Sequence, residues 1–169
     1  MTIKKFRQPT SIYLIFAAIV FVLLIAGPTT AQTPPDIRIH NYLNANNVQR
    51  GGRVQGVVVM EIPAGFHIHS SKPLEKFLIA TKLSVEAPQG VRVGPVSYPR
   101  AVLRNLKFSK NKVSVYEGKA TMRFSVSVPA GYGSDVVDVK ARLRFQSCND
   151  ELCFQPQNRE MTFRLNVTK

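Results

Sequence analysis

The stretch ATMRFSVSV, residues 120–128, alternates between apolar and polar side chains at every position. Its even-numbered positions hold Ala, Met, Phe, Val and Val, and its odd-numbered positions hold Thr, Arg, Ser and Ser. Successive side chains of a β-strand point to opposite faces, so this period of two predicts a strand with one buried and one solvent-facing side. The segments 139–145 and 161–167 alternate in the same way.

The rest of the chain after residue 36 also favours strands. The segment RVQGVVVMEI (53–62) is apolar more continuously, which is typical of a strand buried on both faces. Turn-forming runs rich in Pro and Gly separate the apolar segments. Further strands are expected near 37–42, 78–87, 91–98 and 113–116. Because no amphipathic helical pattern follows residue 36, we predict an all-β fold, an immunoglobulin-like antiparallel β-sandwich.

Residues 1–31 have the layout of a secretory signal peptide. Lys4, Lys5 and Arg7 precede an uncharged apolar run at 12–26, and small residues follow up to Ala31. The run is shorter than the roughly 20 residues that a membrane-spanning helix needs. We therefore predict cleavage after Ala31, a periplasmic location and a single mature domain over residues 32–169, with an uncleaved membrane anchor as the alternative.

The chain is basic, with 23 Lys and Arg against 10 Asp and Glu and a formal net charge of +13. A basic exported protein could bind nucleic acid or anionic lipid. However, the cations are spread out, and Arg142 and Arg144 alternate with the apolar Leu143 and Phe145. This spacing is typical of solvated strand faces. We expect no nucleic-acid partner, and membrane contact only through the signal peptide or an uncleaved anchor.

The segment FQSCNDELCFQP (145–156) contains the two cysteines of the chain, Cys148 and Cys153. Export favours an oxidised pair, so a disulfide between them is predicted. Such a bond closes a very short loop, and the chain-entropy estimate of its stabilisation is only about 2 kcal/mol. Cys148 falls on the same alternation as Arg142 and Arg144, which predicts that it points outward, where a thiolate could attack it.

The residues also allow a metal site at the cysteine pair to be considered. A closed zinc site needs four ligands, and His40, His67 and His69 are the candidates to complete one. Isolated histidines in strands are more often structural, so no metal and no cofactor are expected. Arg142 and Arg144 would favour a thiolate, whereas Asp150 and Glu151 would disfavour it, and no His or Lys adjoins either cysteine in the sequence. Which cysteine is the nucleophile stays open.

Three segments of the chain resemble the amino-terminal periplasmic domain of DsbD, the bacterial thiol:disulfide interchange protein or protein-disulfide reductase. They are GFHIHSSKPLEKFLIATKLSVEAPQGVRVGPVSYP (65–99), FSKNKVSVYEGKATMRFSVSVPAG (108–131) and LRFQSCNDELCFQP (143–156). The resemblance implies an immunoglobulin-like fold in which Cys148 and Cys153 are the redox pair. It also implies a thioredoxin-like domain or a membrane electron transporter as electron donor. The acceptors would be oxidised periplasmic thiol proteins of disulfide isomerisation and cytochrome c maturation.

The family also has a flexible cap loop that lays an aromatic ring over the disulfide until a partner binds. The matching segment is VYEG, which implies a cap made of Val115, Tyr116, Glu117 and Gly118 with Tyr116 as the aromatic. The alternative is an ordinary tyrosine at the end of a strand.

Two features depart from the family pattern. The chain ends at Lys169, so any electron donor is expected to be a separate protein. The spacing of the cysteines is one residue shorter than in the long-loop members, which leaves the loop geometry open. The leading hypothesis is a periplasmic thiol–disulfide exchange carrier that acts as one enzyme component of an electron relay. The rival is a non-catalytic immunoglobulin-like binding or assembly module with a structural disulfide.

Overall fold

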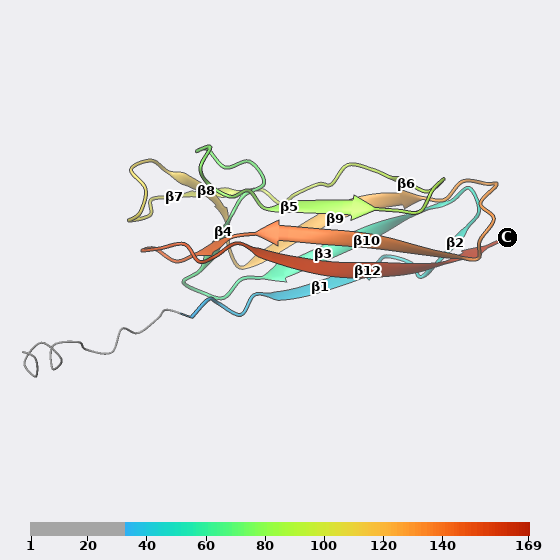
Figure 1. The fold of residues 1–169 in the computed structure, drawn as a ribbon, viewed down its shortest axis with the longest axis horizontal. Coiled ribbons are helices and arrows are strands. Elements are labelled where there is room, and N and C mark those ends of the chain that lie inside the picture. The colour runs from blue at the N-terminus through green and yellow to red at the C-terminus, as the bar shows by residue number, and fades with distance from the viewer. Residues whose placement is uncertain (1–32) are drawn as a thin grey trace, which may run out of the picture. The chain divides into compact units, whose positions relative to one another are not determined.

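The computed structural model describes residues 33–169, and the predicted signal peptide lies outside this range. The described chain contains strands and no helix (Figure 1). Residues 33–169 accordingly contain no helix that is long and apolar enough to span a membrane. The strands are β1 (Arg38–Leu43), β2 (Asn47–Gln49), β3 (Arg53–Glu61), β4 (His67–His69), β5 (Lys82–Glu86), β6 (Arg92–Val93), β7 (Val102–Arg104), β8 (Val113–Tyr116), β9 (Lys119–Ser127), β10 (Val136–Phe145), β11 (Ser147–Cys148) and β12 (Gln157–Thr168).

Two four-stranded sheets form the sandwich, in the orders β1-β3-β9-β6 and β2-β12-β10-β5. Every pairing in them is antiparallel except that of β12 with β2, which is parallel. The all-β sandwich predicted from the alternation is thus confirmed. The predicted strand at 91–98 is much shorter, because only Arg92 and Val93 form a ladder and Ser97 makes one isolated bridge to Arg123.

The core lies between these two sheets and follows the period of two. Alternate residues of β9 and β10 are buried, and so are the corresponding residues at the end of β12. Phe124 of β9 meets Phe163 of β12 edge to face, with ring centroids 5.2 Å apart, so this pair joins the two sheets. The five residues 56–60 of β3 are all buried, which confirms the expectation of a strand covered on both faces.

A third small sheet, in the order β11-β4-β8-β7, occupies one end of the sandwich (Figure 1). It is built from continuations of the long strands, since β11 follows β10 after Gln146 and β8 precedes β9 across Glu117 and Gly118. Gly118 has φ of +60°, a conformation that glycine adopts without steric cost. Both cysteines lie at this end of the molecule.

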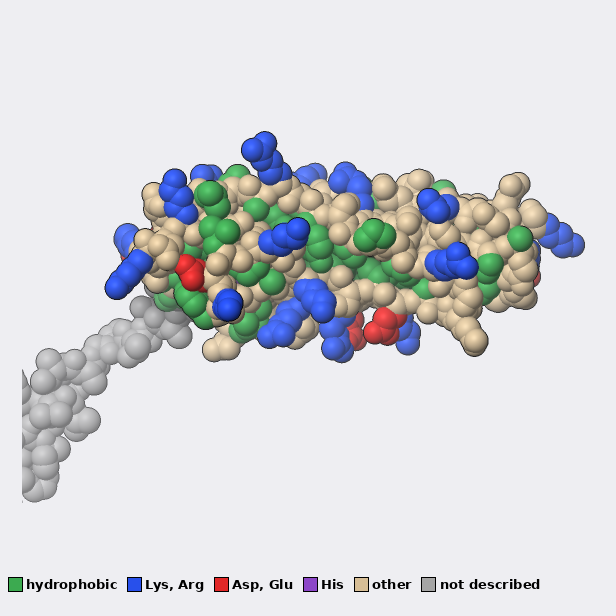
Figure 2. Space-filling model, turned by 90° about the horizontal axis from the view of Figure 1, so that it is seen from above, with side chains coloured by type: hydrophobic (Ala, Val, Ile, Leu, Met, Phe, Trp, Pro, Cys, Tyr) green, Lys and Arg blue, Asp and Glu red, His purple; other side chains and the backbone are tan. Residues whose placement is uncertain are grey.

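The basic residues are spread over the surface rather than gathered. Figure 2 shows Lys and Arg side chains distributed along the whole visible face, separated by other side chains. Several are paired, as with Arg142 and Glu160 at 2.8 Å and Arg50 and Asp135 at 2.7 Å. This distribution agrees with the spacing of cations along the strands in the sequence.

Candidate functional site

Cys148 and Cys153 form a disulfide, as predicted, with an S–S distance of 2.11 Å and Cα atoms 4.0 Å apart. The residues between them make a compact turn. The side-chain oxygen of Asn149 accepts hydrogen bonds from the backbone N–H groups of Glu151, at 2.9 Å, and Leu152, at 2.8 Å. Such a local bond replaces the backbone pairing of a regular turn. The turn therefore holds the two cysteines side by side.

The expected outward orientation of Cys148 is wrong, because Cys148 is 0% exposed. The strand containing Arg144 ends at Phe145, and the chain then joins another sheet, in which Cys148 pairs with His67 of β4. In that sheet β4, β8 and β11 are buried at every residue, so the alternation with Arg144 no longer leads to solvent. Cys153 is only partly buried. Of the two cysteines, Cys153 is therefore the one that solvent reaches.

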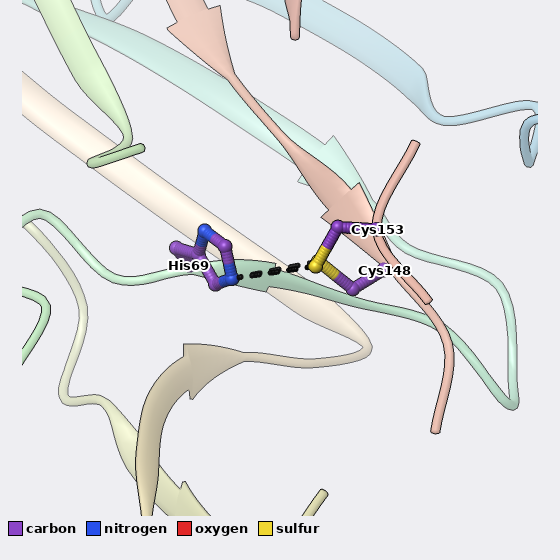
Figure 3. A group of neighbouring side chains, drawn as sticks. All are labelled: His69, Cys148 and Cys153. Carbon is purple, nitrogen blue, oxygen red and sulfur yellow. Dashed lines mark hydrogen bonds between the residues drawn. A yellow bond between two sulfur atoms is a disulfide. The ribbon is translucent and has the colours of Figure 1, made fainter. Parts of the chain in front are cut away.

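A histidine faces both sulfurs, which the sequence did not reveal. Nε2 of His69 lies 3.4 Å from Sγ of Cys148 and 3.8 Å from Sγ of Cys153 (Figure 3). His69 belongs to β4, which lies beside β11 and is far from the cysteines along the chain. One signal in the sequence could have found this contact. His67 and His69 in FHIHS (66–70) are two residues apart and so share one face of a strand, which could have been paired with the segment carrying Cys148.

The protonation of His69 is fixed by its other nitrogen. Nδ1 lies 3.2 Å from the carbonyl oxygen of Ile79, which can only accept a hydrogen bond. A neutral ring that donates Nδ1–H to Ile79 presents an unprotonated Nε2 to the sulfurs. Burial lowers the pKa of His69 by disfavouring the charged ring, and the bond to Ile79 partly opposes this shift. The neutral form of His69 is thereby favoured.

The other two candidate histidines differ in their placement. His67 is buried opposite Cys148, with its ring stacked on Phe108 at 6.5 Å between centroids. Its Nε2 has no hydrogen-bond partner among the described residues. Desolvation, followed by repulsion from His69, lowers its pKa. His40 is exposed on β1, 3.8 Å from Glu61, and is no part of the site.

A second, smaller apolar cluster covers the face of the small sheet on which His67 and His69 lie. It consists of Leu78, Leu106, Val113 and Val115, with Phe108 packed against it. The segment carrying Leu106 and Phe108 is tied to the cysteine turn by Lys107. Its N–H donates to the Asp150 carbonyl at 2.9 Å, and its Nζ lies 3.1 Å from the Glu151 carboxylate. Residues 106–108 thus contact both the cysteine turn and the histidine face of the small sheet.

The predicted cap residue Tyr116 is placed away from the sulfurs. It lies opposite Ile68 in β4, is 4% exposed and belongs to the main core. Its hydroxyl bonds the backbone N–H and the hydroxyl of Ser71, at 3.0 and 2.9 Å. Paired residues of a sheet point to the same face, so Ile68 and Tyr116 lie on the face opposite to Cys148 and His67.

The remaining members of the predicted cap have structural partners. Val115 packs into the small apolar cluster. The carboxylate of Glu117 accepts two hydrogen bonds from Arg104, at 2.8 and 2.7 Å, and this contact lowers the pKa of Glu117. Phe108 is an aromatic side chain on the sulfurs' side of the small sheet, through its contact with His67. The cap role of Tyr116 stays a prediction, and its burial makes the role testable.

Replacing Tyr116 with alanine should destabilise the fold by about 3 kcal/mol or more, because a buried aromatic ring is lost. If Tyr116 is only a core residue, dithiothreitol should reduce the disulfide of the folded variant at the wild-type rate. If Tyr116 is instead a cap, its removal should make that reduction faster. Tyr116→Phe is the matched control, since it keeps the ring and removes the bonds to Ser71, which should cost about 1 kcal/mol. The rate of thiol release and urea unfolding measure the two effects.

Comparison with known proteins places these features in context. The sequence model of the family described as "Thiol:disulfide interchange protein DsbD, N-terminal" matches residues 41–165. A search of curated proteins finds no match. The chain is similar to the solved N-terminal domain of Neisseria meningitidis DsbD in the reduced form, at 16% identity and a TM-score of 0.51, with 83% of this chain and 95% of that chain covered. The N-terminal periplasmic domain of ScsB from Proteus mirabilis is similar at 13% identity and a TM-score of 0.51, over 82% of this chain and 50% of that one. At these identities the two structures support the fold alone.

Proposed function

The chain belongs to the family of DsbD N-terminal domains, and from that premise we propose that it is a periplasmic carrier of electrons through the Cys148–Cys153 pair. The observation that carries the proposal is the asymmetry of the pair. Cys153 is partly exposed, whereas Cys148 is buried against His69. One cysteine is thus partly accessible to a partner, whereas the other is buried.

This asymmetry assigns a step to each cysteine. A thiolate of the donor attacks Sγ of Cys153, which forms a mixed disulfide and releases Cys148 as the leaving group. The released Cys148 takes up a proton, and its thiol can donate a hydrogen bond to the bare Nε2 of His69. A second donor thiolate then attacks the mixed disulfide. In total the Cys148–Cys153 bond breaks, the donor dithiol becomes a disulfide, and two electrons and two protons reach the pair.

The partners follow from the same chemistry. The donor is a dithiol protein, and a thioredoxin-like domain or a membrane electron transporter fits this role. The acceptor is an oxidised periplasmic thiol protein, which the reduced pair attacks by the reverse sequence of steps. The exchange needs no cofactor, because the electrons travel as thiol pairs. A partner reaches Cys153 beside the turn that carries Asp150 and Glu151, so the charge of that turn faces the incoming protein.

The rival function is a binding module whose disulfide only stiffens a loop. Against it stands the small stabilisation that a loop of this length provides, about 2 kcal/mol, in a domain with its own sandwich core. Structural disulfides have reduction potentials below about −300 mV, whereas those of carriers are higher. The reduction potential of the purified protein therefore separates the two functions.

We expect purified protein to show no free thiol until it is reduced, and a reduced thioredoxin-like protein to reduce it within minutes. The physical reason is that Cys153 is reachable by an attacking thiolate. Thiol titration over time gives the rate, with a variant carrying serine at both cysteines as the blank. A disulfide that resists this donor while the fold stays intact would contradict the carrier function.

A further inference from the structure

The two sulfurs and the imidazole nitrogen make up a group of three potential metal ligands. Sγ of Cys148, Sγ of Cys153 and a ring nitrogen of His69 all lie within 4.8 Å of one another. The shorter contacts join Nε2 to the sulfurs, at 3.4 and 3.8 Å (Figure 3). A metal ion bound to thiolate and imidazole, with bonds of about 2.3 Å and 2.0 Å, keeps the S and N atoms about 3.6 Å apart. The imidazole therefore already stands at the distance that two ligands of one ion require.

His69 is held in the orientation of a metal ligand. Its Nδ1–H donates to the Ile79 carbonyl, which leaves the lone pair of Nε2 directed at the sulfurs. In protein metal sites this second hydrogen bond fixes the tautomer and the ring plane of a ligating histidine. Metal binding also requires a neutral imidazole, and His69 is fully buried. The contact joins β4 to β11, so the sequence, in which no histidine adjoins the cysteines, offered His69 only as one of three candidate ligands.

The redox state decides whether the group can close around an ion. In the disulfide the two sulfurs are bonded to each other and neither carries a negative charge. On one ion, two thiolates stand about 3.7 Å apart. The ligand set can therefore form only after the disulfide has been reduced and the sulfurs have separated.

We propose that the reduced protein binds one Cu(I) ion through Sγ of Cys148, Sγ of Cys153 and Nε2 of His69, and that the disulfide form binds none. Thiolates select Cu(I) and zinc among the common metals. Zinc in structural sites takes four ligands, whereas the group in the described residues offers three. A zinc site with three protein ligands takes water as its fourth ligand. Cys148 and His69 are both 0% exposed, and such a dry surrounding fits Cu(I), which two thiolates and one imidazole can saturate. The binding needs only a reduced pair, so it does not depend on the carrier function.

Reduction of the disulfide and binding of Cu(I) are two separate steps. A dithiol supplies two electrons and two protons and becomes a disulfide. A phosphine instead takes the oxygen of one water molecule and becomes its oxide, and the two protons of that water complete the thiols. Cu(I) then displaces both thiol protons, which leave to solvent, while copper keeps its charge of +1. When an acceptor oxidises the pair, the sulfur–sulfur bond forms again and Cu(I) is released. The ion is therefore held or released according to the redox state of the protein.

The test is an anaerobic titration of the protein with Cu(I) in competition with a chromogenic Cu(I) chelator. The wild type is titrated after reduction with a phosphine and in its disulfide form. X-ray absorption of the copper-loaded protein then counts the sulfur and nitrogen neighbours of the ion. His69→Phe removes the nitrogen and keeps a ring. His67→Phe is the matched control, since it makes the same change two residues away, on a histidine outside the ligand group. His69→Gln serves if the Phe variant does not fold.

We expect one Cu(I) per reduced chain, none in the disulfide form, and two sulfur neighbours with one nitrogen. Loss of an outer-shell partner costs a metal site about 10–100-fold in affinity, so His69→Phe should weaken binding by about 100-fold, and His67→Phe by much less. The proposal is overturned if the reduced protein binds no copper, if the absorption spectrum shows no nitrogen, or if His67→Phe weakens binding as much as His69→Phe. Displacement of Cu(I) by an equal concentration of zinc would also overturn it.

Discussion

Replacing Cys148 with serine should abolish turnover and leave the protein trapped as a mixed disulfide with its partner. The remaining Cys153 is partly exposed and can still exchange with a client disulfide. The buried thiol that would resolve the mixed disulfide is missing, so the covalent complex persists. Non-reducing electrophoresis after incubation with an oxidised thiol protein would reveal it as a band that dithiothreitol removes.

Cys153→Ser is the matched variant, because it also leaves one thiol, but a buried one. We expect it to trap the same client at least about tenfold more slowly, since access limits thiol exchange. The double Cys→Ser variant should trap nothing and should lose only about 2 kcal/mol of stability. Its loss of activity would then come from the missing thiols and not from unfolding. Equal trapping by Cys148→Ser and Cys153→Ser would refute the assignment of Cys153 as the attacked sulfur. Unfolding of the double variant would instead indicate a structural staple.

The sandwich could be predicted because its long strands carry their own signal. β9 and β10 alternate buried and less buried side chains over their whole length, and this period follows directly from strand geometry. Short strands give no such signal. β4 and β11 have three and two residues, too few for a period to be detected, and they form only because neighbouring strands hold them. Of the sheet that carries the cysteines, the sequence-based expectation therefore contained only the strand at 113–116, which is β8.

The disulfide itself could be predicted, but its surroundings could not. The pairing of Cys148 with Cys153 followed from export and from an even number of cysteines. The burial of Cys148 depends on its place in the small sheet, and the contact with His69 depends on the register of β4 and β11. Both features depend on contacts between segments that are far apart in the sequence. A single sequence shows that His69 exists without showing which strand it meets.

The placement of Tyr116 illustrates a further limit. A match to a family motif aligns positions along the chain, but it does not say to which side of a strand a side chain points. One residue changes the face, because neighbouring side chains of a strand alternate. Val115 packs into the small cluster on one face, whereas Tyr116 joins the main core on the other. The orientation of a cap residue therefore has to come from the sheet register.

Replacing Gly56 with valine should destabilise the domain by about 3–5 kcal/mol, the range found when a buried phenylalanine is lost. Gly56 lies in the middle of β3, directly opposite Phe124 of β9. A Cβ atom on Gly56 would stand only 2.7 and 2.8 Å from two carbon atoms of the Phe124 ring, Cε2 and Cε1. The glycine thus provides the space in which that ring lies. A side chain there forces the ring aside or bends the strand, and either change destabilises the core.

The effect should be large because the displaced ring links the two main sheets. Phe124 is the β9 partner in the edge-to-face contact with Phe163, so moving it opens the core between β9 and β12. Gly133→Val is the matched control, since a Cβ atom on Gly133 has no heavy atom within 4 Å. An exposed substitution of this kind should change the unfolding free energy by about 0.5 kcal/mol at most. Urea unfolding of both variants measures the difference. Similar costs at the two glycines would show that the Phe124 ring can move without loss, and that the contact between the sheets does not depend on the space at Gly56.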